Sequence, residues 1–385
     1  MRNIVGQTPR GDDFFPRDNI VQRIYNRLNA GAHVYLAAPR RVGKTAIMRF
    51  LEDRPQENYE FKYLITESVD NASTYFQVLL ESLHKLKTLP RRSLEAIGSF
   101  LSRINQVGAG GFEVGLSQGQ ETDHFAELKS LMRTLDTDGT TVVLMIDEFP
   151  QTVENILRAH GAEAAEQFLQ FNREIRHEAH DHIRFILTGS IGLPTMAERL
   201  DASVHINDLN VIEIPPLSRP AAATLTTTLL DDNSVPYDDA AVAHLLDKMS
   251  WFIPFHIQLA VQELIDDYLD TNETVHVDAV DRAFSKIGEM RNDIYFAHYY
   301  SRLKKIFDNR EYGFALALLE QLAREEACTL QHIRDLAHTH NLENYAIVLR
   351  TLAFDGYIFA SATDGDTHYR FTSPVLRLWW GNYVR

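Results

Sequence analysis

The sequence predicts an α/β fold whose first part holds a parallel sheet, followed by a helical lid and a small C-terminal domain. The apolar run 34–38 leads through a short loop into a helix. The unbroken run 141–146 has the pattern of a buried parallel strand. After Arg219 the sequence has helical periodicity almost throughout. These observations predict an α/β domain over 1–217, a helical lid over 218–290 and a further domain over 291–385.

Composition limits the function classes. The chain has 385 residues, with 45% hydrophobic and 24% charged residues, which is ordinary for a globular protein. Its one cysteine, Cys328, excludes an intrachain disulfide and a cysteine zinc site. The net charge of −15 opposes indiscriminate nucleic-acid binding and does not favour a membrane-surface role. With no secretory signal and no run of about 20 apolar residues, the expected location is the cytoplasm.

Residues 34–45, VYLAAPRRVGKT, are typical of a phosphate-binding P-loop between a strand and a helix. Backbone N–H groups of such a loop surround phosphates, and the helix N-terminus adds partial positive charge. Lys44 is expected to reach the outer phosphates, and the Thr45 hydroxyl to bind Mg²⁺. Ala38 stands where the motif usually has its first glycine. The predicted nucleotide-binding residues here are Ala38, Pro39, Arg40, Arg41, Val42, Gly43, Lys44, Thr45 and Ala46.

The second half of the expected site follows the strand 141–146, which ends in Asp147-Glu148. A strand that delivers a carboxylate from its C-terminal end is the Walker B arrangement. Asp147 is expected to hold Mg²⁺, and Glu148 to orient and deprotonate the attacking water. The alternative is an acidic pair at the start of a surface helix. Together the two motifs predict ATP/ADP and Mg²⁺ as cofactors.

The segment before the first strand contains Phe14-Phe15-Pro16-Arg17 ahead of a helix with Ile20, Ile24 and Leu28 on one face. Arg17 and its neighbours could fold over an adenine, or Asp18 could simply cap the helix. A second strand is expected over 61–66 and helices over 71–89, 94–104 and 122–135. The glycine-rich stretch 108–117 fits an inserted hairpin or a loop.

Another expected strand, 183–190, follows a helix over 162–177 and ends in hydroxyl residues. Because ligands lie at the carboxyl ends of such strands, Thr188 or Ser190 is a candidate sensor of the γ-phosphate. The alternative is a plain Gly-Ser turn. A final strand over 211–214 is closed by Pro215-Pro216, since proline cannot continue a ladder.

The lid is expected to hold helices over 221–230, 239–249, 254–268 and 280–287. Pro254 falls in the first turn of the third helix, where its missing N–H costs little. This helix start could face the nucleotide, or Pro254 could be a capping proline beside an aromatic core.

The C-terminal domain is expected to contain helices over 312–325, 330–338 and 342–355, then a hairpin turning at Asp364-Gly365-Asp366. This order predicts a winged helix-turn-helix. Residues 291–385 hold eleven Lys/Arg and eleven Asp/Glu, and the expected recognition helix offers only Arg350 as a base-reading cation. A role in protein contact or packing is therefore favoured over DNA binding.

Five motifs occur in a characteristic order: GDDFFPR (11–17), APRRVGKT (38–45), IDEFP (146–150), LTGS (187–190) and FTSPVLRLWW (371–380). With these motifs the chain resembles the archaeal-type ATPase family of the AAA+/STAND P-loop proteins. The resemblance implies an AAA+-like ATPase core, a helical lid and a winged helix whose arrangement switches with nucleotide. It also implies that Arg17 lies on the adenine side and that Pro254 is a lid proline near the nucleotide.

The leading hypothesis is an ATP-binding and ATP-hydrolysing switch that controls a protein partner or self-association. Glu148, Lys44, Thr188 and Ser190 are its expected catalytic residues, and Thr45 and Asp147 its metal ligands. The alternative is a DNA-binding AAA+ ATPase of the initiator or transposition-helper kind. A third hypothesis is a scaffold that keeps nucleotide without turnover.

Overall fold

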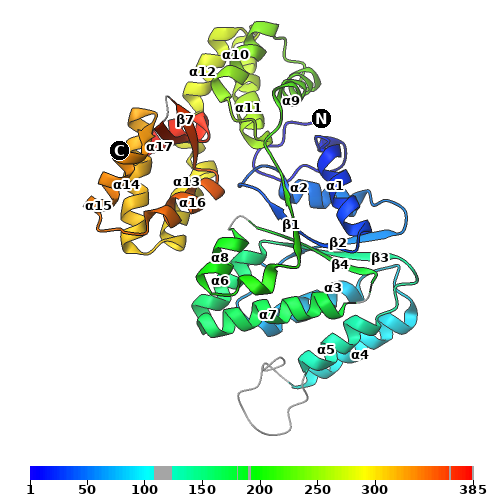
Figure 1. Cartoon of the computed structure of the whole chain (residues 1–385). Coiled ribbons are helices and arrows are strands. Elements are labelled where there is room, and N and C mark those ends of the chain that lie inside the picture. The colour runs from blue at the N-terminus through cyan, green and yellow to red at the C-terminus, as the bar shows by residue number, and fades with distance from the viewer. Residues whose placement is uncertain (108–123, 180, 190–191, 364–365, 384–385) are drawn as a thin grey trace. The chain divides into compact units, whose positions relative to one another are not determined.

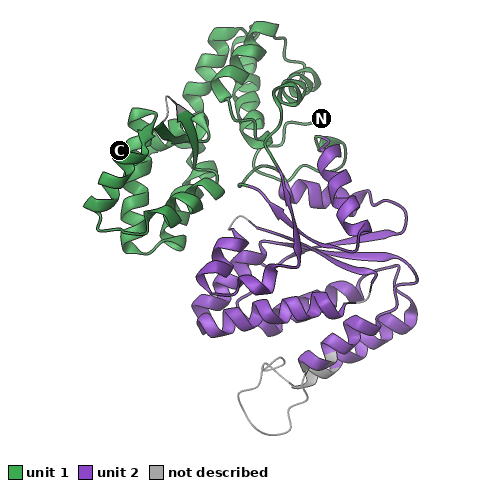
Figure 2. Ribbon diagram, in the orientation of Figure 1, with its two compact units in different colours: residues 1–15, 39–43, 215–385 green, residues 16–38, 44–214 purple. Residues whose placement is uncertain are grey.

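The computed structural model describes residues 1–107, 124–179, 181–189, 192–363 and 366–383 (Figure 1). Two compact units form within this chain (Figure 2). Unit 2 contains Pro16–Ala38 and Lys44–Ile214. Unit 1 contains Met1–Phe15, Pro39–Gly43 and Pro215–Arg385. The loop segment Pro39–Gly43 is therefore flanked on both sides by unit 2 in sequence, although it packs with unit 1.

Unit 2 is built on a five-stranded parallel sheet in the order β2-β3-β4-β1-β5. Its central strands are almost wholly buried, which explains their continuous apolar sequence. The order places β4 between β1 and β3. The strands are β1 (His33–Ala37), β2 (Tyr59–Ile65), β3 (Thr141–Asp147), β4 (Ile183–Thr188) and β5 (Leu209–Glu213).

Helices cover both faces of this sheet, with α1 and α2 on one side and α3, α6 and α7 on the other (Figure 1). The core between the layers contains Ile24 and Ile47 on one side and Phe149 and Phe168 on the other, all at most 1% exposed. The helices are α1 (Asp18–Asn29), α2 (Lys44–Asp53), α3 (Ala72–His84), α4 (Arg91–Val107), α5 (His124–Thr134), α6 (Phe149–His160), α7 (Ala162–Glu178) and α8 (Leu193–Arg199).

Unit 1 begins its main segment with four helices, α9 (Arg219–Asp232), α10 (Asp239–Met249), α11 (Pro254–Thr271) and α12 (Val277–Ile287). Ser218 and Asp238 cap the first two, each accepting a hydrogen bond from a backbone N–H of the first turn. Helix α11 has ten buried residues, twice as many as each of the other three helices. It packs against α9 and α12.

The rest of unit 1 is a helical domain with a small antiparallel sheet in the order β6-β8-β7. Its core includes Trp379 and Trp380, which are at most 1% exposed, and Trp379 Nε1 donates to Asp293 Oδ1 at 2.8 Å. The elements are α13 (Asp293–Ile306), α14 (Asn309–Glu325), β6 (Cys328–Thr329), α15 (Leu330–Thr339), α16 (Tyr345–Phe354), β7 (Ile358–Thr363), β8 (Asp366–Phe371) and α17 (Pro374–Tyr383).

The expected α/β class and parallel sheet are confirmed. The expected strand over 183–190 ends at Thr188, and the expected helix over 342–355 is the shorter α16. Helices α8, α13 and α17 were not expected from the sequence, and a helix at the position of α6 was only the alternative interpretation of the acidic pair. Ser190, the stretch 108–117 and part of the hairpin turn lie outside the described residues. The three-domain division and the winged helix-turn-helix stay predictions. No helix among the described residues combines the length and apolar character needed to cross a bilayer.

Candidate functional site

The loop between β1 and α2 has the backbone of a phosphate-binding loop. Arg41 (φ 65°) and Gly43 (φ 106°) both lie in the left-handed region, which turns successive N–H groups toward one side. Nothing lies within 4 Å of a Cβ added to Gly43, so conformation and not space favours glycine there. The backbone φ angle of Ala38 is not positive. The departure from the usual glycine at Ala38 therefore causes no backbone strain.

Lys44 opens α2 and is buried, with 7% of its surface exposed. Its Nζ donates a hydrogen bond to the Ala38 carbonyl at 2.8 Å, which joins the two ends of the loop. Val42 and Ala46 are buried beside it at 1% and 7% exposure. The ammonium group thus lies at the base of the loop, where the sequence motif requires a cation.

The two sequence motifs meet at Asp147. Its Oδ2 accepts a hydrogen bond from Thr45 Oγ1 at 2.7 Å, and a second from the Tyr63 hydroxyl at 2.7 Å. Asp147 is 5% exposed, and this burial raises the pKa of its carboxyl, opposed by the two hydroxyl donors. A hydroxyl and a carboxylate oxygen are the ligand types that Mg²⁺ prefers, so Thr45 and Asp147 fit the expected metal.

Glu148 directly follows β3 and is the N-cap residue of α6. Its backbone is left-handed (φ 56°, ψ 32°), and its N–H donates to Asp147 Oδ1 at 3.1 Å. Non-glycine residues held in this conformation cluster at functional sites. The sequence left open a Walker B pair or the start of a helix, and Glu148 is both the residue after the buried strand and a helix N-cap.

Thr188 ends β4, the strand inserted between those of the two motifs. Its side chain is fully buried, and its hydroxyl donates to the Leu36 carbonyl of β1 at 3.1 Å. A Cβ on the next residue, Gly189, would lie 2.4 Å from Pro150 Cδ, so the strand end packs tightly on the start of α6. The sensor role of Thr188 stays a prediction, and Ser190 lies outside the described residues.

The other two predicted nucleotide contacts are at helix starts. Arg17 is the N-cap residue of α1, its side chain is half-buried, and burial lowers the pKa of its guanidinium. The alternative in which Asp18 caps this helix is wrong, because Asp18 is the first residue within it. Pro254 is the first residue of α11, as its position in the sequence predicted. The roles of Arg17 and Pro254 toward a nucleotide stay predictions.

Tyr63 is the main residue that the sequence did not indicate. Its ring lies under the Arg49 guanidinium at 3.6 Å from the ring centroid, and its N–H donates to Glu52 Oε1 at 3.0 Å. Arg49 in turn forms an ion pair with Glu52 at 2.8 Å. Two residues of α2 therefore fix Tyr63 on β2 so that its hydroxyl reaches Asp147. No local sequence motif predicts the Tyr63–Asp147 contact, because it depends on the register between β2 and β3.

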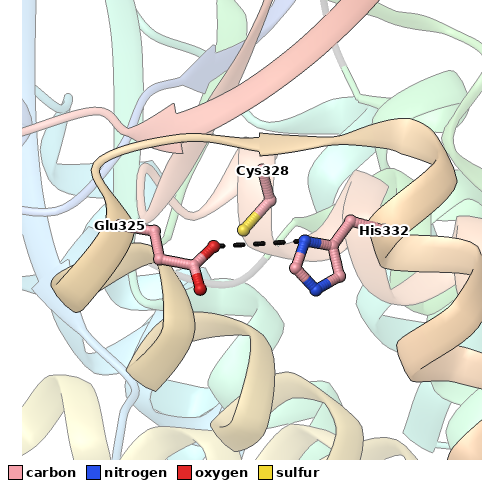
Figure 3. Close-up of side chains that lie close together, drawn as sticks. All are labelled: Glu325, Cys328 and His332. Carbon is pink, nitrogen blue, oxygen red and sulfur yellow. Dashed lines mark ion pairs between the residues drawn. The ribbon is translucent and has the colours of Figure 1, made fainter.

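A separate group of metal-ligand types lies in the C-terminal domain, where side chains of Glu325, Cys328 and His332 approach within 4.8 Å (Figure 3). Glu325 and His332 are exposed. Cys328 is 2% exposed and belongs to the hydrophobic core, and burial, with Glu325 nearby, raises the pKa of its thiol to about 11. A neutral core thiol accounts for this arrangement without a metal.

Comparisons with known proteins give one family match and several structural likenesses. Residues 21–194, a range that contains both motifs, match the family model described as predicted AAA-ATPase. No curated protein matches the chain in sequence. Among solved structures, the fold is similar to the Walker-type ATPase PABY2304 of Pyrococcus abyssi, with a TM-score of 0.63, 15% identity and 99% of each chain covered.

The fold is also similar to the ORC2 protein of Aeropyrum pernix, whose structure is that of ADPNP-ADP complexes. That likeness has a TM-score of 0.54 and 15% identity, and covers 96% of this chain and 94% of the other. The family match over residues 21–194 supports the P-loop ATPase part of the expected resemblance, and the two structural likenesses show that this chain shares the fold of those proteins.

Proposed function

We propose that this protein is a Mg-ATP-dependent molecular switch of the STAND/AAA+ type that hydrolyses ATP slowly and controls a partner. Nucleotide state would set the arrangement of the lid (218–290) and of a C-terminal winged helix (291–385). The partner is a protein or a second copy of this chain, because the C-terminal domain carries as many acidic as basic residues.

The observation that carries the proposal is the 2.7 Å hydrogen bond between Thr45 Oγ1 and Asp147 Oδ2. It joins the end of the phosphate loop to the end of β3, two places 102 residues apart in sequence. A Mg²⁺ ion held by the Thr45 hydroxyl and, through water, by Asp147 would neutralise charge on bound phosphates.

The remaining catalytic roles follow from position. Lys44 lies at the base of the loop and would place its charge on the outer phosphates. Glu148 follows the metal-ligand residue on a fixed left-handed backbone, and would orient and deprotonate the attacking water. Thr188 would sense the γ-phosphate, because it ends β4, the strand between those of the two motifs.

The switch hypothesis is supported by the contacts that the loop segment Pro39–Gly43 makes within unit 1. Ala38 and Lys44 belong to unit 2, while the five residues between them belong to unit 1 with the lid and the C-terminal domain. Differential binding to two arrangements is what lets a ligand shift a conformational equilibrium.

The test is steady-state ATP hydrolysis by wild type and Lys44→Ala, with and without duplex DNA, while the oligomeric state is recorded by light scattering. We expect slow turnover that the variant loses and that DNA leaves unchanged. Strong stimulation by DNA would instead favour a DNA-binding ATPase of the initiator kind. Tightly retained ADP with no turnover by wild type would favour a nucleotide-bearing scaffold.

A further inference from the structure

We propose that Phe255, in the first turn of α11, is a positioning residue for the phosphate loop and acts through Arg41. The inference rests on the proposed nucleotide site and adds a residue that neither sequence motif contains. Through this contact with Arg41, helix α11 would hold the loop in its phosphate-binding conformation.

The first contact is a cation–π interaction. The Arg41 guanidinium lies over the Phe255 ring, with its Cζ 4.4 Å from the ring centroid. Phe255 is 6% exposed and packs edge-to-face on Tyr295 at 5.6 Å, so the ring itself is fixed. Arg41 is half-buried, and this burial lowers the pKa of its guanidinium. Such a desolvated contact is stronger than an exposed one.

The second contact holds the start of the same segment. Gly356, in the turn between α16 and β7, has a φ of +78°. A Cβ added to it would lie 2.8 Å from Pro39 Cβ and 3.1 Å from Trp251. The turn is itself fixed on both sides: Asp355 pairs with the buried Arg302 at 2.8 Å, and the Tyr357 hydroxyl donates to the Tyr299 carbonyl at 2.8 Å. Pro39 therefore rests on a rigid glycine turn.

The contacts of Arg41 and Pro39 stabilise a loop backbone conformation that is unfavourable on its own. Arg41 has a left-handed φ of 65°, which a residue with a Cβ rarely adopts unless its surroundings impose it. The ring of Phe255 holds the far end of the Arg41 side chain, and Gly356 fixes Pro39 two residues earlier. The Lys44–Ala38 hydrogen bond closes the base of the loop. The loop is thus preorganised, and preorganisation raises affinity by reducing what must be ordered on binding.

The first test is the affinity of the full chain for fluorescent ADP and ATP analogues, compared between Phe255→Leu and Phe284→Leu. Phe284 is a matched control because it is also 6% exposed, lies in the same helical region and lies under a cation, with Lys248 Nζ 5.4 Å from its ring. We expect about fivefold weaker binding in Phe255→Leu, and a change of less than about twofold in Phe284→Leu. Circular dichroism confirms that each variant is folded.

The second test uses the glycine turn, in case Phe255→Leu does not fold. Gly356→Ala pushes a methyl group against Pro39, whereas Gly139→Ala introduces the same strain at φ +77° with nothing within 4 Å of the new Cβ. Only Gly356→Ala should weaken nucleotide binding.

Each outcome decides between the two proposals. Equal binding by Phe255→Leu and Phe284→Leu, or tighter binding by Phe255→Leu, would overturn the positioning role while leaving the proposed function intact. Failure of wild type to bind either nucleotide would overturn the proposed function itself, and this inference with it.

Discussion

The Thr45 hydroxyl donates a 2.7 Å hydrogen bond to Asp147 Oδ2, and the Tyr63 hydroxyl donates to the same oxygen at the same distance. One carboxylate oxygen at the end of β3 therefore accepts hydrogen bonds from hydroxyl groups of both α2 and β2. This relationship makes the candidate metal site a junction of three elements, and the first predictions concern its members.

Thr45→Val should abolish Mg-dependent nucleotide binding, because valine keeps the shape of threonine and lacks the hydroxyl. Thr45→Ser keeps the hydroxyl and should retain most of the activity, so it is the matched control. Titration of a fluorescent ATP analogue in Mg²⁺ and in EDTA measures the difference. Similar Mg²⁺ dependence in Thr45→Val and wild type would show that this hydroxyl is not a ligand.

Glu148→Gln should reduce ATP turnover by about 100-fold or more, because the amide cannot accept a proton from the attacking water. Binding of Mg-ATP should be unchanged, since glutamine has the same size and the loop contacts remain. Phosphate release and equilibrium binding measured on the same sample separate the two effects. Turnover at the wild-type rate would mean that another group is the base.

Tyr63→Phe should raise the Mg²⁺ concentration needed for half-maximal nucleotide binding, because Asp147 Oδ2 loses one of its two hydroxyl donors. The ring stays under Arg49, so packing is preserved. Tyr59→Phe is the control, since Tyr59 is on the same strand and its hydroxyl bonds to Asn29 at an exposed site. Equal Mg²⁺ requirements in both variants would contradict the orienting role.

The stability of the protein should fall in mild acid because of His256. Burial, together with the positive charge of Arg41, lowers the pKa of this histidine to about 3, from 6.5. Its Nδ1 lies 3.1 Å from Ser373 Oγ. Below about pH 6.5 the unfolded chain binds a proton that the folded chain does not bind until about pH 3. The contribution of His256 to the free energy of unfolding should thus decrease by about 1.4 kcal/mol per pH unit across this window.

Urea unfolding at about pH 7, 6 and 5 checks this. In His256→Asn the free energy of unfolding should change less steeply with pH than in wild type. The difference in slope should correspond to close to one proton, whatever the absolute stability of the variant. Parallel curves for wild type and His256→Asn would show that this histidine does not carry the effect.

The sequence predicted the parts of the site that are local. The apolar run before the P-loop and the run that ends at Asp147 each specify a strand and its neighbouring loop within about a dozen residues. A helix at the position of α6 was only the alternative to a Walker B pair, and the structure has both, with Pro150 in the first turn of α6.

Other features depend on register or on distant packing, and no local pattern encodes them. Tyr63 reaches Asp147 only because β2 and β3 pair in parallel with Ile65 beside Asp147. Arg41 was predicted as a loop residue, but its stacking on Phe255 requires the lid to be folded. The insertion of β4 between β1 and β3 likewise follows from the whole sheet.

Amide hydrogen exchange in two nucleotide states tests the switch most directly. Glu148→Gln saturated with Mg-ATP would be compared with the same variant saturated with Mg-ADP. We predict that exchange differs between the two states in peptides from the lid or the C-terminal domain, residues 218–385, as well as in the P-loop. Differences confined to the P-loop and its immediate neighbours would contradict the claim that nucleotide state rearranges these domains.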